Sequence, residues 1–127
     1  MSVKYVRSDQ WSNLVERSDR PVLVEFMSHT CSICAAMAPY VDKLADKFEG
    51  KAFIYRVNAQ EEQGLAMRFG VMGVPSFLML CKGKPIASMA GSVYPALLDR
   101  MVQEAMEHGS ECATKQTRVV YSISGYG

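Results

Sequence analysis

Two cysteines, Cys31 and Cys34, stand where one hydrophobic pattern gives way to another, and this junction constrains the fold most strongly. Residues 22–27 form an apolar run interrupted only by Glu25, which is typical of a central strand covered on both faces. Residues 33–48 instead repeat their apolar side chains with the spacing of an amphipathic helix. The sequence therefore predicts a buried strand that leads, through a short loop, to two cysteines at the start of a helix.

The rest of the pattern predicts one α/β domain. A chain of 127 residues, of which 49% are hydrophobic, is long enough to bury a core of its own. The expected element order is β-α-β-α-β-α-β-β-α, which gives a mixed central β-sheet flanked by helices on both faces. Strands are expected at 3–6, 22–27, 52–57, 77–81 and 85–89, and helices from an N-cap at Ser8, after Cys31, at 61–69 and at 93–108.

The proline in the second helix and the C-terminal end of the chain refine this layout. Pro39 lacks a backbone N–H and is expected to kink the helix that follows the cysteines. We predict that residues 1–108 form the domain and that 109–127 form a C-terminal extension. Within the extension, residues 118–123 have strand propensity, whereas the glycine-rich end favours fraying. An added strand and a loose tail therefore both stay open.

Charge and hydropathy exclude several classes of function. The formal net charge is +1, and both signs are spread along the chain, so neither a nucleic-acid footprint nor a polybasic membrane anchor is indicated. No apolar stretch approaches the roughly 18 residues of a membrane span. The first residues also lack the apolar core of a signal peptide. We expect a cytoplasmic protein that is a monomer by default, with no nucleic-acid or membrane partner.

The cysteine pair has the properties of a reactive dithiol. Only a thiolate attacks a disulfide, and an ordinary cysteine is mostly protonated at neutral pH. The unpaired amides and the dipole at a helix N-terminus favour the anion. Two intervening residues let Cys34 reach back to close a ring and resolve a mixed disulfide. We therefore predict that Cys31 is the exposed nucleophile and Cys34 the shielded resolving thiol.

Two other readings of the cysteines stay open. His29 and the pair offer three zinc ligands, with a fourth from elsewhere in the chain: His108, Cys81 or Cys112. Structural zinc sites usually draw on two closely spaced ligand pairs, and only one is present, so we predict no metal. The other reading is an inert pair of small buried residues. Cys81 and Cys112 are expected to be reduced, with a bridge between them as the alternative.

Glu25 is a candidate for proton transfer because it interrupts a strand suited to a dry interior. If its side chain points inward, burial raises its pKa and suits it to exchange a proton with Cys34. If it lies at the margin of the sheet, it is merely solvated. Arg56, on the neighbouring expected strand, is placed to pair with Glu25 and to keep the carboxylate ionised.

Several motifs, taken in chain order, resemble the thioredoxin family over residues 3–106. They are Glu25 in its apolar strand, the dithiol, Pro39, Arg56 before Val57-Asn58, the run at 70–75, the Lys82-Gly83-Lys84 turn and Gly91. The resemblance implies a thioredoxin fold with a cis peptide before Pro75, set against the dithiol. It also implies that the backbone of Val74 pairs with an extended substrate segment and that the Gly91 loop lines the same groove.

The implied function is thiol–disulfide exchange that reduces protein disulfides. The family uses no cofactor besides its redox-active disulfide, here Cys31–Cys34, and takes electrons from an NADPH-dependent thioredoxin reductase. Glu25 and Pro75 complete the implied catalytic set, and Arg56 and His29 are expected to tune it. The expected substrate-binding residues are Thr30, Ser32, Ile33, Val74, Gly91 and Ser92.

The sequence departs from the usual Trp-Cys-Gly-Pro-Cys motif of that family. Thr30 replaces the tryptophan, and Met27 stands where an aromatic residue is common. Ile33 replaces the proline, which restores a backbone donor near the Cys31 sulfur and supplies an apolar contact. Two alternative functions therefore stay open: a disulfide oxidase or isomerase, and a non-catalytic module that holds a partner with its groove and tail.

Overall fold

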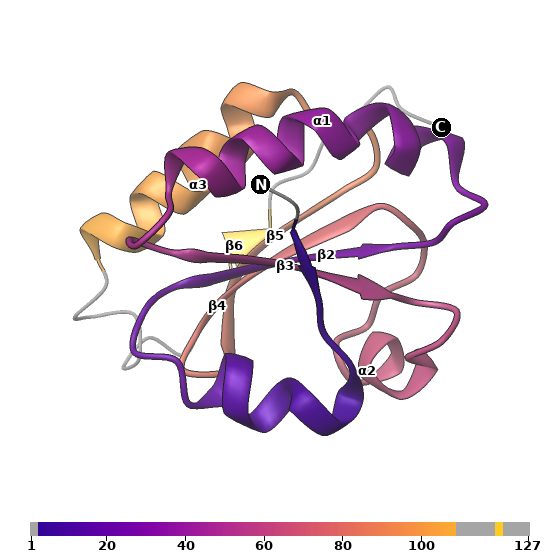
Figure 1. Cartoon of the computed structure of the whole chain (residues 1–127), viewed down its shortest axis with the longest axis horizontal. Coiled ribbons are helices and arrows are strands. Elements are labelled where there is room, and N and C mark those ends of the chain that lie inside the picture. Colours follow the sequence, from indigo (N-terminus) through magenta and orange to yellow (C-terminus); the bar gives the residue numbers. More distant parts are fainter. Residues whose placement is uncertain (1–2, 109–118, 121–127) are drawn as a thin grey trace.

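A six-stranded mixed sheet lies at the centre of the chain, in the order β1-β3-β2-β4-β5-β6 (Figure 1). The computed structural model describes residues 3–108 and 119–120. Strands β1, β3 and β2 are parallel, β4 is antiparallel to β2 and β5, and β6 is parallel to β5. The strands are β1 Lys4–Tyr5, β2 Val22–Met27, β3 Phe53–Asn58, β4 Ser76–Cys81, β5 Lys84–Ala90 and β6 Val119–Val120.

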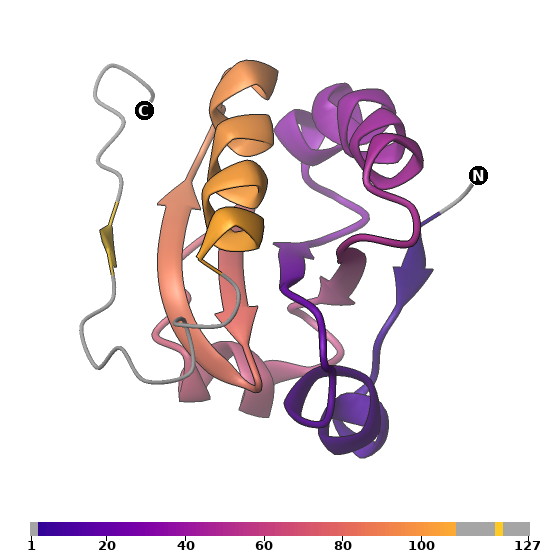
Figure 2. The ribbon, with the colours of Figure 1, turned by 90° about the vertical axis from the view of Figure 1, so that its left-hand side faces the viewer.

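Helical segments cover both faces of the sheet, as predicted. Helices α1 (Ser32–Lys47) and α3 (Pro95–Glu107) lie on one face. Helix α2 (Gln63–Arg68) and two short N-terminal segments, η1 (Ser8–Gln10) and η2 (Ser12–Glu16), lie on the other (Figures 1 and 2). Within the described residues, no helix is both long enough and apolar enough to cross a membrane.

The two-residue period of the strands decides which side chains face α1. Leu23 of β2 and Ile54 of β3 belong to the core under α1 and α3, whereas the intervening Val24 and Tyr55 belong to the core on the opposite face. Since side chains alternate along a strand, Glu25 and Arg56 share the side of Leu23 and Ile54. The sheet therefore presents both charged residues to α1.

The first helical segment differs from its prediction. Instead of one helix capped by Ser8, the chain forms the 3-10 turn η1, whose N-cap is Arg7, and then the π-helical turn η2. The backbone N–H and hydroxyl of Ser8 both donate to a carboxylate oxygen of Glu62, at 2.9 and 2.6 Å. Since that hydroxyl is taken by a side chain distant in sequence, Ser8 does not cap the turn.

The hairpin between β4 and β5 is confirmed, with the two-residue turn Lys82–Gly83 between them. Both turn residues have positive φ, 51° and 80°, as type I′ hairpin turns require. In the tail, β6 lies inside the predicted strand at 118–123 and pairs with Ala87 and Ser88 of β5. The remaining predictions for the C-terminal extension fall on residues outside the described ones.

Candidate dithiol site

The end of β2 and the start of α1 position the two cysteines. Cys31 is the N-cap of α1, and Cys34 lies in its first turn; the two form a disulfide with their Cα atoms 5.2 Å apart. The Cys31 side chain is half-buried, whereas Cys34 is only 3% exposed. The Cys34 backbone N–H donates to the Cys31 sulfur at 3.1 Å. The first sulfur is thus the accessible one, and it rests on a helix-terminal amide that favours negative charge.

Two loops, one before β4 and one after β5, meet beside this disulfide. The Val74–Pro75 peptide bond is cis, as the resemblance implied, and the Val74 carbonyl oxygen lies 3.8 Å from the Cys31 sulfur. The Gly91 N–H donates to the Pro75 carbonyl at 2.8 Å. The structure therefore brings the dithiol, the cis-proline loop and the Gly91 loop together, although they lie far apart in the sequence.

The other residues expected to bind substrate surround this point. Thr30, Ser32 and Ser92 are exposed, and Ile33 is 38% exposed although it is a large apolar residue. His29 is exposed too, and its ring lies 5.9 Å from the ring of Tyr5. The contact that His29 makes is thus with the N-terminal strand.

Two apolar side chains near the site were missed by the sequence analysis. Met72, two residues before Val74, is 97% exposed, and Tyr94, three residues after Gly91, is 75% exposed. Single exposed apolar side chains are common on protein surfaces, so what sets these two apart is their place in the chain, beside the two loops that meet at Pro75. A methionine inside a glycine-containing loop was the only sequence signal for Met72.

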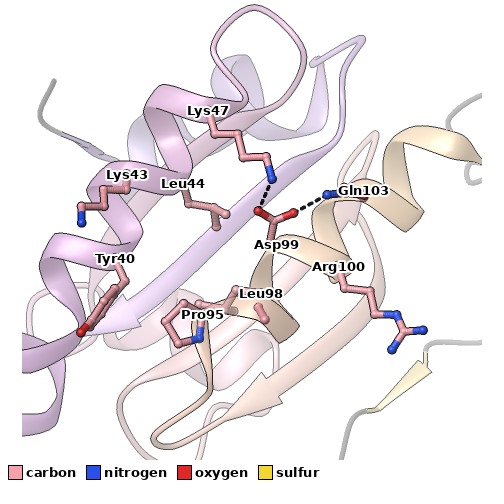
Figure 3. Close-up of a pocket in the computed structure, with 10 residues that line it drawn as sticks. Tyr40, Lys43, Leu44, Lys47, Pro95, Leu98, Asp99, Arg100 and Gln103 are labelled. Atoms are coloured by element: carbon pink, nitrogen blue, oxygen red, sulfur yellow. Dashed lines mark hydrogen bonds and ion pairs between the residues drawn. The ribbon is translucent and has the colours of Figure 1, made fainter.

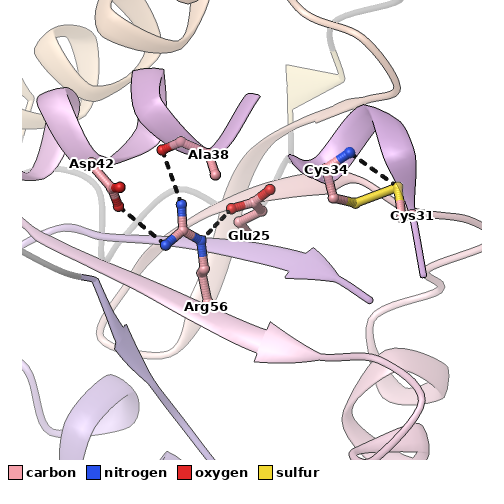
Figure 4. A network of polar contacts seen from close by, with 6 residues as sticks. All are labelled: Glu25, Cys31, Cys34, Ala38, Asp42 and Arg56. Carbon is pink, nitrogen blue, oxygen red and sulfur yellow. Dashed lines mark hydrogen bonds and ion pairs between the residues drawn. A yellow bond between two sulfur atoms is a disulfide. The ribbon is translucent and has the colours of Figure 1, made fainter. Parts of the chain in front are cut away.

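Below the dithiol, Glu25 is part of a buried ionic network (Figure 4). Its side chain is 1% exposed, and its carboxylate accepts a hydrogen bond from Nε of Arg56 at 2.9 Å. The Nη1 and Nη2 atoms of Arg56 donate to the Asp42 carboxylate at 3.1 Å and to the Ala38 carbonyl at 3.2 Å. Glu25 is thus inside the protein, and its pairing with Arg56 is confirmed.

Burial is the main influence on the acidity of Glu25. Loss of hydration raises the pKa of Glu25 above its ordinary value, and the nearby Asp42 charge raises it further, while Arg56 acts in the opposite direction. The sequence analysis did not find Asp42 or Ala38. Ala38 comes directly before Pro39 and Asp42 three residues after it. Their spacing of four residues puts them on one face of the expected helix, and this was the available sequence signal.

The remaining cysteine predictions have mixed outcomes. Cys81 is buried at the end of β4 and is disulfide-bonded, so the expectation of a reduced thiol is wrong for it. Cys112 lies outside the described residues, and a bridge between the two stays a prediction. Within residues 3–108, no group of three or more His, Cys, Asp or Glu side chains is arranged to hold a metal ion.

A separate groove of about 400 Å³ lies between α1 and α3 (Figure 3). Its floor includes Leu44 and Leu98, and Lys47 of α1 reaches Asp99 of α3 across it, at 2.5 Å. Its lining contains neither cysteine of the dithiol nor the cis-proline. The groove is therefore distinct from the exchange site.

The mixed sheet with helices on both faces, the dithiol at the start of α1 and the opposing cis-proline loop define a thioredoxin fold. The family model Thioredoxin matches residues 2–104. The chain belongs to the thioredoxin family. A mutant thioredoxin from Halobacterium salinarum NRC-1 superposes with a TM-score of 0.73 over 81% of this chain and 89% of that one, at 24% identity, and supports the fold.

Relatives of known sequence agree with this assignment. The chain is 33% identical over 102 residues, 80% of its length, to "Thioredoxin M-type, chloroplastic" of Pisum sativum. It is 28% identical over 102 residues, 80% of its length, to "Thioredoxin" of Haemophilus influenzae and covers 95% of that protein. It spans only 59% of the pea protein and 56% of the M-type thioredoxin of Spinacia oleracea. Family membership and the Cys31–Cys34 disulfide support a thiol–disulfide oxidoreductase function, and the family needs no bound cofactor.

Proposed function

We propose that this chain reduces disulfide bonds in proteins by dithiol exchange through Cys31 and Cys34. The observation that carries the proposal is the unequal exposure of two bonded sulfurs at one helix N-terminus. Cys31 is reachable from solvent and Cys34 is buried behind it. Such an arrangement lets one sulfur attack a partner while the other waits within bonding distance.

The exchange proceeds in two balanced steps. The Cys31 thiolate attacks one sulfur of the substrate disulfide; a mixed disulfide forms, and the other substrate sulfur leaves as a thiolate and takes a proton. Cys34 then loses its proton, attacks the Cys31 sulfur and releases the second substrate thiol. The substrate gains two electrons and two protons, and the dithiol becomes the Cys31–Cys34 disulfide.

Glu25 is proposed to accept the Cys34 proton in the second step. Its carboxylate is buried on the α1 side of the sheet, and in Figure 4 it is seen between Arg56 and the disulfide. Its raised pKa brings the group closer to the range in which a carboxylate exchanges protons near neutral pH. The site contains no other buried acid among the described residues.

Substrate binding is assigned to the two loops that meet the dithiol. We propose that the backbone of Val74 pairs with an extended segment of the substrate, with Pro75 holding that backbone against Cys31. The Gly91–Ser92 loop and the exposed side chains of Thr30, Ser32 and Ile33 line the remainder. Because backbone hydrogen bonds do not depend on most side chains of the substrate, such pairing accepts many substrate sequences.

The cellular setting follows from the direction of the reaction. A protein that reduces disulfides needs a reducing compartment, for which we propose the cytoplasm, and a donor that regenerates the dithiol, for which we propose an NADPH-dependent thioredoxin reductase. His29, exposed beside the site, is proposed to tune the reactivity of Cys31 from the surface.

An insulin-reduction assay driven by dithiothreitol tests the activity. We expect Cys31→Ser to abolish catalysis and Cys34→Ser, its matched control for loss of a thiol, to accumulate a mixed disulfide at Cys31. Catalysis by Cys31→Ser at the native rate would refute the assignment. A redox titration against glutathione separates a reductant from an oxidant, and we expect a potential below that of the glutathione buffer.

A further inference from the structure

The guanidinium of Arg56 joins three acceptors that come from two different elements. Its Nε binds Glu25 on β2, while Nη1 binds Asp42 and Nη2 binds the Ala38 carbonyl, both on α1 (Figure 4). The Arg56 side chain is 9% exposed. Each nitrogen of the group therefore has its own partner in a nearly closed environment, which fixes the position of the guanidinium.

The place where Arg56 meets α1 is also special. Ala38 directly precedes Pro39, which lies inside the helix. A proline contributes no N–H to the helical ladder, so this turn of α1 has one backbone donor fewer than its neighbours. The carbonyl left without that donor is that of Ala35, four residues earlier, whereas the guanidinium donates to the Ala38 carbonyl and fastens the helix to the sheet. The same helix carries Cys31 and Cys34 at its start.

We propose that Arg56 is a positioning residue for the resolving step: it holds the Glu25 carboxylate and the dithiol-bearing helix in one fixed relation. The inference rests on the proposed role of Glu25 as proton acceptor. It assigns the effect to the forked shape of the guanidinium as well as to its charge. A lysine would keep the charge but offers one compact donor group, which cannot bind three separated acceptors in this geometry.

The charged groups around Glu25 act on its protonation in opposite directions. Arg56 approaches from β3 and Asp42 from α1, and the residue opposite Glu25 on β4 is the apolar Phe77. Arg56 favours the Glu25 anion, whereas the charge of Asp42 disfavours it. In a plot of the resolving rate against pH, the acid limb is the range in which the rate falls as Glu25 is protonated. Weakening the arginine contact and neutralising Asp42 should therefore move this limb in opposite directions.

The two steps can be timed separately by mixing the reduced protein with a chromogenic aromatic disulfide in a stopped-flow instrument. Attack by Cys31 releases the first coloured thiolate, and resolution by Cys34 releases the second. For Arg56→Lys we expect the first phase to change less than about twofold and the second to slow on the order of tenfold at neutral pH. Its acid limb should move to higher pH. Asp42→Asn should move that limb to lower pH, and the exposed Arg68→Lys is the matched control.

A double-variant comparison separates positioning from simple loosening of the fold. If Arg56 acts through Glu25, Arg56→Lys causes no further slowing in a Glu25→Gln background. Equal slowing in both backgrounds, or acid limbs that do not move, would overturn the inference. If Glu25→Gln itself leaves the second phase unchanged, the proton-acceptor role falls and the inference falls with it. If Glu25→Gln slows that phase and Arg56→Lys does not, only the inference fails. Should Arg56→Lys not fold, the direction of the Asp42→Asn shift decides.

Discussion

Arg56 donates its Nε–H to the Glu25 carboxylate at 2.9 Å across two parallel strands whose register sets the two residues opposite each other. Both side chains project toward α1, so the pair lies in the layer between sheet and helix. A buried ion pair recovers its lost hydration only through good geometry. Removing one member would leave the other charged and buried, which makes conservative variants the informative ones.

The first prediction concerns the pH dependence of stability. The pKa of Glu25 is raised above its ordinary 4.5 in the folded protein, mainly by burial. The folded state therefore binds the proton more tightly than the unfolded state. This contribution to stability is fully present below the unfolded pKa and is lost as pH rises through the folded pKa. Glu25→Gln lacks this loss, so its free energy of unfolding relative to wild type should increase as pH rises above 4.5.

Denaturant unfolding of both proteins at a series of pH values measures this difference. A constant offset between the two curves would show that Glu25 titrates in the same way in the folded and unfolded chain. An offset that decreases with rising pH would contradict the sign of the pKa shift.

The second prediction is that Cys31 is unusually reactive in the reduced protein. The Cys34 N–H, 3.1 Å from the Cys31 sulfur, and the helix N-terminus both stabilise a thiolate. In a Cys34→Ser variant, which retains that backbone donor, we expect iodoacetamide to modify Cys31 about tenfold faster than free cysteine at neutral pH. Mass spectrometry of the labelled peptide identifies the modified residue. A rate equal to that of free cysteine would argue against an activated sulfur.

The third prediction tests the hairpin turn. Gly83 has φ near +80°, and a Cβ added there would lie 2.9 Å from Cγ of Glu16. Gly83→Ala should lower the free energy of unfolding by roughly 1–3 kcal/mol, through backbone strain and crowding together. Gly64→Ala is the matched control. Gly64 lies within α2, and a Cβ added there would meet nothing within 4 Å. There we expect a gain of up to about 1 kcal/mol from helix propensity. Equal effects at both sites would show that strain and crowding do not matter at Gly83.

The fourth prediction concerns the exposed methionine beside the cis-proline loop. If Met72 contacts bound protein substrates, Met72→Ser should raise KM for insulin several-fold, since partial burial of such a side chain contributes roughly 1 kcal/mol. The rate with a small aromatic disulfide should stay unchanged. Met67→Ser, at an 80% exposed position on α2, is the control. Equal changes in KM for the two variants would exclude Met72 from the binding surface.

The strand-to-helix junction could be predicted from the sequence because local patterns determine it. A continuous apolar run marks β2 as a central strand, and the spacing after Cys31 marks α1. Glu25 was a candidate for the same reason, since a charge in such a strand must lie inside or at its margin. The structure settles the choice, with 1% of the side chain exposed.

What was missed depends on contacts between segments that are distant in sequence. Ser8 is a residue type favoured at N-caps, yet its hydroxyl donates to Glu62, 54 positions further along. Asp42 reads as an ordinary solvated helix residue until Arg56, 14 positions later, is seen to donate to it. The exposure of Met72 could not be read from the sequence, because it depends on whether other segments pack over the residue. Local propensity contains no information about such partners.

The two outermost strands have a consequence for association between molecules. β1 and β6 are each two residues long, and β6 occupies the free side of β5 at Ala87 and Ser88 (Figure 2). Short edge strands offer few unpaired N–H and C=O groups with which another chain could pair. This is one way in which natural sheets avoid edge-to-edge aggregation. In the proposed function, the backbone that pairs with an extended substrate segment is instead that of Val74, whose carbonyl oxygen lies 3.8 Å from the Cys31 sulfur.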